Sequence, residues 1–258
     1  MKWLRFEGAA GPQYGRQVGA AEVEPVLGTP FDGAVATGQR IPLDEVRLLA
    51  PVAVRRVFGV GLNYVNHIRE TGSKTPRIPL LFMKPEGAVV GPGAPVVYPL
   101  EGKEVHYEAE LAVVIGRRAR RIAPADAPSV ILGYTCANDI SERVIQREEM
   151  SMGCLVISKG YDSFCPLGPV IVTDLDPACL RIVARVNGVT RQDSSTSDLL
   201  FDVPTLVSYL SQAVTLEPGD VIITGTPAGV GPVVPGDVME IEIEGIGVLR
   251  NPVIAEAR

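Results

Sequence analysis

The sequence predicts a mainly β protein with a few helices, of the α+β class. Among 258 residues there are 27 glycines and 22 prolines, which is too many for a helical bundle and suits strands joined by many turns. Apolar, β-branched segments recur between Gly, Pro and Asp residues. These segments do not alternate with helices in a βαβ rhythm, so we expect a mixed, mainly antiparallel sheet.

The composition is that of a folded chain, with 46% hydrophobic and 21% charged residues. A net charge of -6 gives no electrostatic reason to bind phosphate backbones or anionic lipid, and 5% aromatic residues leave few stacking platforms. We therefore expect neither nucleic acid nor membrane as a partner. Residues 1–7 hold no apolar run of signal-peptide length, so a cytoplasmic location is expected.

The only shift in composition lies early in the chain. Residues 1–50 are rich in turns and short in apolar runs. We expect them to form a small N-terminal β-rich domain, an appendage to a larger domain over residues 51–258.

Strands are predicted where apolar residues alternate or run continuously between turn residues. The expected strands cover residues 57–62, 105–116, 131–137, 180–186, 221–224 and 238–243. Asn187 and Gly188 follow one of them, and both residue types tolerate the positive φ of a tight turn. A β-hairpin is therefore predicted around Asn187-Gly188.

Two helices are predicted, over residues 141–150 and 204–213. The first is expected to begin at Asp139 or Ser141 as its cap. The second follows Asp202, and its apolar residues recur at helical spacing.

The segment 105–116 carries the strongest chemical signal. Strand alternation places Glu108 and Glu110 on one face, and two neighbouring buried carboxylates are costly unless a metal ion or a basic side chain compensates them. Asp139 ends the next predicted strand, and three carboxylates favour Mg²⁺ or Mn²⁺ over Zn²⁺, although His106 could be a further ligand. The alternative is that the glutamates line a solvated face and Asp139 caps a helix.

His67 and Glu70 stand three residues apart, so on a helical turn the carboxylate can touch the imidazole. Such a pair makes a general base, because the carboxylate orients the ring and the histidine titrates near neutrality. The alternative is a surface salt bridge on a short helix.

The glycine-rich segment 225–231 offers free backbone N–H groups and a hydroxyl to an anionic ligand. It has neither the lysine and helix of a P-loop nor the spacing of a dinucleotide-binding turn, so a carboxylate is expected at Gly225 and Thr226 rather than ATP or NAD. Lys159 could stabilise an oxyanion; the alternative is an exposed lysine paired with Asp162.

Several short blocks follow one another along the chain, namely Gly61-Leu-Asn-Tyr, Met83-Lys-Pro, Tyr107-Glu-Ala-Glu-Leu, Gly133-Tyr-Thr-Cys-Ala-Asn-Asp, Cys165-Pro-Leu-Gly-Pro and Ile223-Thr-Gly-Thr-Pro. Together and in this order they resemble the fumarylacetoacetate hydrolase family across residues 52–256. The resemblance implies a β-roll core, a homodimer, and Mg²⁺ or Mn²⁺ held by Glu108, Glu110 and Asp139.

By the same resemblance, His67 and Glu70 match an acid/base pair on a lid and Lys159 an oxyanion-stabilising lysine. Gln146 and Thr226 match positions that contact substrate or water. The segment 141–146 departs from many members, which have a small residue at 142 and Asp at 144.

Three reactions of a small 2-oxo acid, namely isomerisation, decarboxylation and C–C bond hydrolysis, pass through the same enolate, which a divalent ion stabilises. The sequence looks most like isomerase/decarboxylase members of the homoprotocatechuate type. Acylpyruvate (fumarylpyruvate-type) C–C hydrolysis and oxaloacetate decarboxylation are the alternatives. A non-catalytic, metal-stabilised protein is a further one, against which the presence of His67, Glu70 and all three acids argues.

Overall fold

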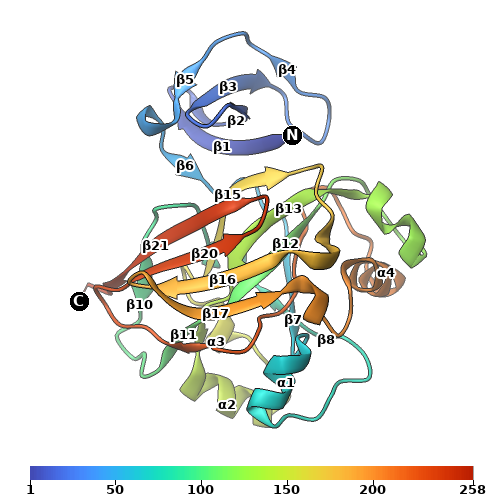
Figure 1. The fold of residues 1–258 in the computed structure, drawn as a ribbon, viewed down its shortest axis with the longest axis vertical. Coiled ribbons are helices and arrows are strands. Elements are labelled where there is room, and N and C mark those ends of the chain that lie inside the picture. Colours follow the sequence, from blue (N-terminus) through green and yellow to red (C-terminus); the bar gives the residue numbers. More distant parts are fainter. Residues whose placement is uncertain (258) are drawn as a thin grey trace.

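A computed structural model describes residues 1–257, and strands dominate it (Figure 1). The mainly β fold with a few helices is confirmed. The strands are β1 (Lys2–Gly8), β2 (Gly11–Val18), β3 (Glu22–Leu27), β4 (Val35–Ala36), β5 (Ile41–Pro42), β6 (Leu48–Leu49), β7 (Val57–Gly61), β8 (Leu80–Lys84), β9 (Val89–Val90), β10 (Val96–Tyr98), β11 (Val105–Tyr107), β12 (Ala109–Ile115), β13 (Ile131–Asn138), β14 (Ser141–Glu142), β15 (Cys165–Val172), β16 (Arg181–Val186), β17 (Val189–Ser195), β18 (Val221–Ile223), β19 (Gly231–Pro232), β20 (Val238–Ile243) and β21 (Gly247–Ala255).

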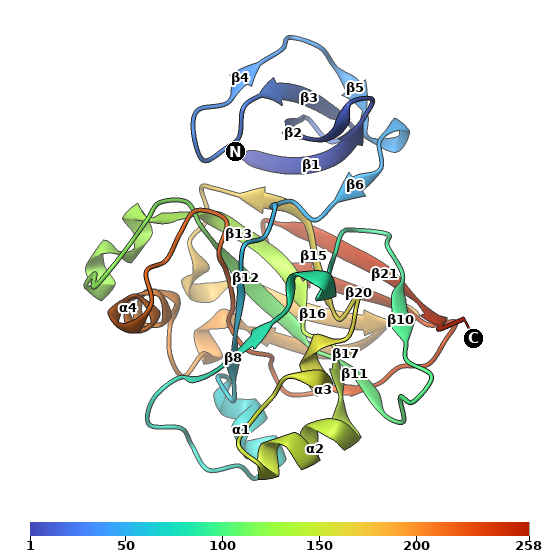
Figure 2. The same cartoon turned by 180° about the vertical axis from the view of Figure 1, so that it is seen from behind.

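The helices are short and lie outside the sheets. They are α1 (Val65–Thr71), α2 (Arg143–Ser151), α3 (Ile157–Gly160), α4 (Val203–Ala213) and the 3₁₀ helices η1 (Leu43–Glu45), η2 (Glu86–Ala88), η3 (Pro124–Ser129), η4 (Pro177–Cys179) and η5 (Thr196–Asp198). Helices α1, α2 and α3 gather at the end of the molecule opposite the N-terminal strands (Figures 1 and 2). None of the helices within residues 1–257 has the length and apolar character needed to cross a membrane.

The largest sheet has thirteen strands and is open. Its main path runs β4-β3-β2-β1-β15-β13-β12-β18-β7-β8, while a five-stranded sheet runs β10-β21-β20-β16-β17 and a three-stranded sheet β14-β11-β19. Only the pairs β7 with β18, β9 with β15 and β10 with β21 are parallel among the described strand pairs. The predicted mixed, mainly antiparallel sheet is therefore confirmed.

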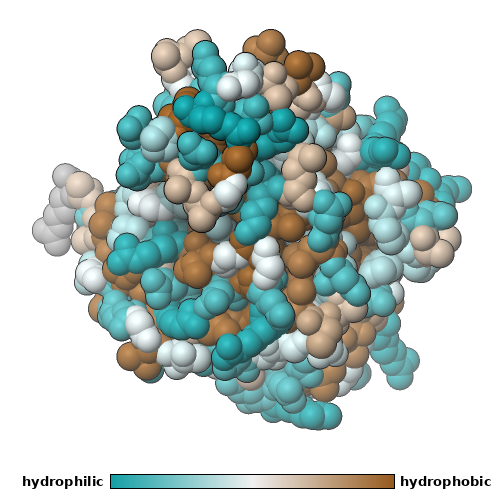
Figure 3. Space-filling view, turned by 45° about the horizontal axis from the view of Figure 1, so that its top comes forward, coloured by the Kyte–Doolittle hydropathy of each residue, from teal (hydrophilic) through white to brown (hydrophobic). Residues whose placement is uncertain are grey.

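Strands β1 to β6 lie together at one end of the molecule, at the top of Figure 1. Strand β1 pairs with β15 through Lys2 opposite Val172 and Trp3 opposite Ile171, so hydrogen bonds of one sheet connect this part to the rest. The division into two domains at residue 50 stays a prediction. The face seen in Figure 3, with this end brought forward, mixes hydrophilic and hydrophobic residues without a broad area of either kind.

Two local predictions from turn and cap residues are confirmed. Asn187 and Gly188 have φ of 52° and 77° and join β16 to β17 as a hairpin. Helix α4 begins after Asp202, whose carboxylate accepts a hydrogen bond from the Thr205 amide. The predicted cap of α2 was wrong, because Glu142 is the residue whose side chain accepts from the Ile145 amide.

The predicted strand over residues 105–116 is divided at Glu108. Strand β11 pairs with β14 and β19, whereas β12 pairs with β13 and β18 in the large sheet. The break has a physical cause: the Glu108 amide donates to Asn138 Oδ1 and the Glu108 carbonyl accepts from the Asp139 amide, both at 2.9 Å. Glu108 therefore lies where the chain passes from one sheet to another, directly beside Asp139.

Alternation along β12 separates two apolar clusters. Leu111, Val113 and Ile115 belong to one cluster, and Ala112 and Val114 to the other. All five are fully buried, so β12 is a central, rigid strand for the acidic residues at its start.

Candidate active site

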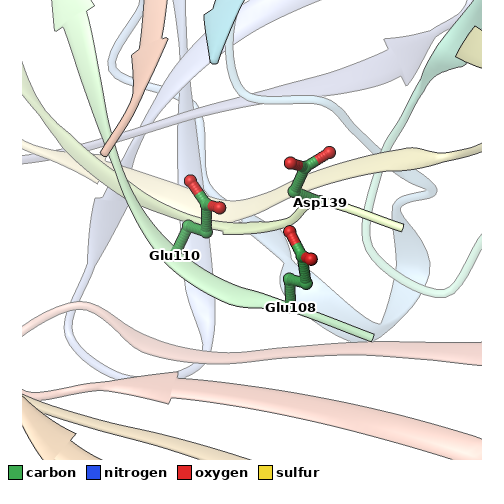
Figure 4. Close-up of side chains that lie close together, drawn as sticks. All are labelled: Glu108, Glu110 and Asp139. Atoms are coloured by element: carbon green, nitrogen blue, oxygen red, sulfur yellow. The ribbon is translucent and has the colours of Figure 1, made fainter. Parts of the chain in front are cut away.

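Three carboxylates meet at the start of β12 and the end of β13. Figure 4 shows Glu108 just before β12, Glu110 within β12 and Asp139 just after β13, with the three side chains close together. One ligand oxygen from each of the three lies within 4.8 Å of the others, and all three side chains are buried. The alternative of a solvated sheet face is wrong for Glu108 and Glu110, which are 5% and 1% exposed.

Glu108 has two basic partners. Lys159 Nζ donates to Glu108 Oε2 at 2.8 Å, and Arg143 Nη2 lies 2.6 Å from Oε1. Burial raises the pKa of Glu108, but the charges of Lys159 and Arg143 outweigh burial and hold this pKa well below its usual range. Glu108 is therefore a carboxylate at neutral pH.

Asp139 is held by two lysines. Lys84 Nζ lies 2.5 Å from Oδ1 and Lys159 Nζ lies 2.6 Å from Oδ2. Both lysines are buried, and such side chains are almost never buried without a partner of opposite charge. Burial lowers the pKa of Lys159, but Asp139 and Glu108 reverse that shift and raise it above its ordinary value. The alternative pairing of an exposed Lys159 with Asp162 is wrong.

Glu110 differs from the other two acids. Its Oε2 accepts from the Gly225 amide at 2.7 Å, and no basic side chain of residues 1–257 forms an ion pair with it. Burial, followed by the charges of Asp139 and Glu108, raises the pKa of Glu110 well above its usual range. Positive charge is therefore lacking on the Glu110 side of the cluster.

His67 and Glu70 form the expected pair on α1. His67 Nδ1 lies 3.0 Å from Glu70 Oε2, and Glu70 Oε1 accepts from the Gly229 amide at 3.0 Å. His67 is 7% exposed and lines the cavity, whereas the Glu70 side chain is 42% exposed, so the pair spans from the cavity to the surface. The carboxylate bridges α1 and the glycine-rich loop and fixes the direction of the imidazole ring.

A cavity of about 400 Å³ joins these groups. Seven of the nine predicted site residues line it, namely His67, Glu108, Glu110, Asp139, Gln146, Lys159 and Thr226. Glu70 lies behind His67, and the Gly225 amide is bonded to Glu110 rather than directed at the cavity. Gly225 has φ of 98°, and a Cβ there would lie 2.8 Å from Asn63 Cβ, so glycine permits this close approach.

Thr226 and Gln146 are positioned by neighbouring side chains. Thr226 Oγ1 accepts from Gln192 Nε2 at 2.8 Å, and Gln146 Oε1 accepts from Arg143 Nη1 at 2.6 Å. His106, considered as an additional ligand, lies outside the group of three acids and has Nε2 3.1 Å from Glu104 Oε1.

Three basic residues of this site were missed in the sequence. Arg143 and Arg147 line the cavity from α2, and Lys84 lies beneath Asp139 at the end of β8. Their signal was present: Arg143, Gln146 and Arg147 recur at helical spacing, and Lys84 stands in the Met83-Lys-Pro block.

Comparisons with known proteins identify the class of protein. Residues 56–254 match the model described as fumarylacetoacetate (FAA) hydrolase C-terminal, and residues 1–51 match the one described as Rv2993c-like, N-terminal. The chain belongs to the fumarylacetoacetate hydrolase family.

Two relatives illustrate the range of the family. The chain is 46% identical over 232 residues to protein Rv2993c of Mycobacterium tuberculosis, covering 89% of this chain and 86% of the relative. It is 43% identical over 225 residues to the mitochondrial oxaloacetate tautomerase FAHD2A of Bos taurus, covering 83% and 71%.

Solved structures agree over nearly the full length. They include a 5-carboxymethyl-2-hydroxymuconate delta-isomerase from Mycobacterium smegmatis (TM-score 0.92, 43% identity, covering 99% of this chain and 100% of that one). A 2-hydroxyhepta-2,4-diene-1,7-dioate isomerase from Mycobacterium marinum has TM-score 0.92 and 41% identity, covering 100% of both chains. A maleylpyruvate hydrolase from Sphingobium sp. SYK-6, crystallised with manganese(II) and pyruvate, has TM-score 0.82 and 34% identity, covering 100% of both.

The acidic cluster fits a divalent ion. Three buried carboxylates supply the hard oxygen ligands that Mg²⁺ and Mn²⁺ prefer, and Glu110, which lacks a basic partner among the described residues, leaves a place for further positive charge.

Proposed function

We propose that this protein is a divalent-metal-dependent isomerase/decarboxylase acting on a 2-oxo or 2-hydroxydienoic diacid of the homoprotocatechuate type. One observation carries the proposal: a buried three-carboxylate cluster and a carboxylate-paired histidine line the same cavity. The isomerases among the similar structures support this reaction class.

In this proposal Glu108, Glu110 and Asp139 hold Mg²⁺ or Mn²⁺. The bound ion would supply Lewis-acid stabilisation of the negative charge that develops on the 2-oxo oxygen of the substrate. The Gly225 amide holds Glu110, and Lys84 and Lys159 hold Asp139. Lys159 also holds Glu108, so the three acids are oriented before any ligand enters.

His67 acts as the general acid/base. Glu70 engages Nδ1, which leaves Nε2 as the ring atom that takes a proton from one carbon of the substrate and returns it to another. Glu70 stabilises the imidazolium formed in between. Glu70 also accepts a hydrogen bond from the Gly229 amide, which connects the pair to the glycine-rich loop.

Lys159, Gln146 and Thr226 complete the binding of the reacting end. The Lys159 ammonium lies between Glu108 and Asp139 and would stabilise an oxyanion beside them. Gln146 and Thr226 present polar groups to the cavity and would hydrogen-bond the substrate carboxylate or a water.

The chemistry of α2 supports a substrate with a second carboxylate. Arg143 and Arg147 are successive on one helical face and both line the cavity. Arginine is well suited to bidentate carboxylate recognition, so a diacid would extend from the acidic cluster toward α2.

A second candidate is keto–enol tautomerisation or decarboxylation of oxaloacetate, also a diacid. It is favoured by the 43% identity to the bovine oxaloacetate tautomerase FAHD2A. Acylpyruvate hydrolysis is the third candidate reaction, because the maleylpyruvate hydrolase has the same fold at 34% identity.

The cytoplasmic location and the homodimer also stay predictions. Light scattering would measure the mass of the protein in solution and so test the homodimer.

The test is an ultraviolet assay of the three substrate classes in parallel, after chelation and then with Mg²⁺ or Mn²⁺ restored. We expect metal-dependent turnover of a hydroxydienedioate, and loss of about 10²–10⁴-fold in kcat for His67→Ala with unchanged melting temperature. Asn66→Ala, an exposed neighbour on α1, is the matched control and retains activity. Full activity of His67→Ala would overturn the assignment of the base.

A further inference from the structure

The chain between α2 and α3 is held by few apolar contacts although it leads to Lys159. From Ser151 to Ile157 every residue is exposed except Leu155, which is half-buried. Met152, Val156 and Ile157 are apolar and more than half exposed. Packing of this segment's own side chains therefore does not determine where α3 begins, and Lys159 lies only two residues beyond Ile157.

The buried carboxylate of Glu149, at the end of α2, instead determines where α3 begins. The two oxygens of Glu149 accept hydrogen bonds from the amides of Val156 at 3.2 Å, Ile157 at 2.7 Å and Ser158 at 3.0 Å. The Ser158 hydroxyl donates to the same carboxylate at 2.5 Å. These are the first N–H groups of α3, which have no partner inside the helix.

Glu149 is charged where it lies. Burial raises its pKa, but hydrogen bonds from Ser158, Ile157 and Val156 outweigh burial and lower the pKa below its usual value. A carboxylate that accepts several N–H bonds is held more tightly than a neutral cap, because charge-assisted hydrogen bonds are roughly twice as strong.

The bonded segment ends at the reacting groups. Ser158 precedes Lys159, whose Nζ lies 2.8 Å from Glu108 and 2.6 Å from Asp139. Helix α2 also carries Arg143 and Gln146, which line the same cavity. One carboxylate thus connects the helix that faces the substrate to the helix that carries the lysine; the two helices lie side by side in Figures 1 and 2.

We propose that Glu149 is a positioning residue that sets the location of Lys159 through the amides that begin α3. The inference rests on the proposed function for the role of Lys159, but the position of the lysine can be measured without turnover. Loss of the carboxylate frees residues 156–158 and lets the lysine leave Glu108 and Asp139.

The first experiment measures lysine accessibility in Glu149→Ala. A short pulse of an acetylating reagent is applied to the metal-free protein, and each lysine is quantified by peptide mass spectrometry. In the unmodified chain Lys159 and Lys84 are both buried and stay unlabelled, whereas the exposed Lys74 reacts. We expect labelling of Lys159 to rise about tenfold or more in Glu149→Ala, with Lys84 unchanged because its partners Asp139 and Ile140 lie outside the freed segment.

The second experiment separates positioning from general stability by kinetics. Loss of an outer partner of a reacting group typically costs about 10–100-fold in activity, and we expect this loss in kcat with KM changed less than about threefold. A double variant of Glu149→Ala with Lys159→Ala should be no slower than Lys159→Ala alone, because Glu149 acts only through that lysine.

Asp202→Ala is the matched control. Asp202 caps α4 by the same kind of bond, from its carboxylate to the Thr205 amide, and does not line the cavity. It should lower the melting temperature while leaving Lys159 labelling and kcat unchanged. Where Glu149→Ala does not fold, the isosteric Glu149→Gln replaces it, with smaller changes of the same sign.

Unchanged labelling of Lys159 in the Glu149 variant overturns the inference whatever reaction the protein catalyses. Additive losses in the double variant also overturn it. Altered labelling in a protein that turns over none of the three substrate classes would instead remove the proposed function and leave the positioning role standing.

Discussion

Two buried acids of this protein, Asp220 and Glu110, differ in how many partners their carboxylates have. Asp220 is fully buried and receives the Nε and Nη2 of Arg56 together with the Glu217 amide. Glu110 is 1% exposed, yet the Gly225 amide is its single hydrogen-bond donor among the described residues. The first carboxylate is satisfied within the fold and the second is not.

The comparison indicates that the fold pairs the acid that only stabilises it and leaves unpaired the acid that lies in a candidate binding site. Arg56 and Asp220 connect the start of β7 to the start of β18, and the guanidinium also donates to the Thr215 carbonyl. Glu110 faces a cavity that contains two further carboxylates. An acid left without compensating charge in a cavity is a mark of function, since buried groups are otherwise paired.

The largest expected effect is on activity. Glu110→Gln should lower metal-dependent turnover about 100-fold or more, because loss of groups that merely support metal ligands already costs about 10–100-fold. Its metal-free unfolding free energy should not fall, since the amide can still accept from the Gly225 amide and removes an uncompensated charge. Isothermal titration with Mn²⁺ and denaturant unfolding measure the two quantities.

Asp220→Asn should show the opposite pattern. Breaking a buried pair costs about 3–5 kcal/mol, and we expect about 3 kcal/mol here because the Arg56 side chain is 32% exposed. Activity per folded molecule should be unchanged. Urea unfolding measures both variants. If Asp220→Asn and Glu110→Gln changed the unfolding free energy by the same amount, the contrast between the two acids would be wrong.

A third effect is the pH dependence of metal-free stability. The folded-state pKa of Glu110 is raised, so the folded protein binds more protons than the unfolded chain above about pH 4.3, the ordinary value for Glu. Stability from this group is therefore present at lower pH and lost as pH rises toward the raised pKa. Thermal unfolding across pH in EDTA should show this decline in the unmodified chain and in Asp220→Asn but not in Glu110→Gln.

The smallest effect concerns substrate choice. Arg147 lines the cavity but its side chain is 64% exposed and paired with Glu104, and exposed charge pairs contribute about 0–1 kcal/mol. Arg147→Met should raise KM about fivefold for a diacid and leave KM for a monoacid analogue unchanged. Glu148→Gln, an exposed neighbour on α2 outside the cavity lining, should change neither.

Much of the fold was predictable because its signals are local. The Asn187-Gly188 turn, the Asp202 cap and the strand segments depend on residues close in sequence, and the structure confirms them. The break at Glu108 was not predicted, because it depends on Asn138 and Asp139, about thirty residues away.

The candidate site divides in the same way. Period-2 alternation brought Glu108 and Glu110 to one face, and helical spacing brought His67 to Glu70. Which acid each lysine pairs with was not predictable, because Lys84 reaches Asp139 across 55 residues and Lys159 reaches Glu108 across 51. The same holds for Glu149, whose spacing to Ser158 carries no signal of a hydrogen bond.

The sequence by itself determined a mainly β chain, its tight turn and cap, and the residue types that gather as acids and as an acid/base pair. Only the tertiary structure decided which acid receives a cation and which is left without one. The physical reason is that alternation and helical spacing act over a few residues, whereas burial and ion pairing depend on how distant segments meet. Glu108 and Glu110, two residues apart, therefore have pKa values shifted in opposite directions.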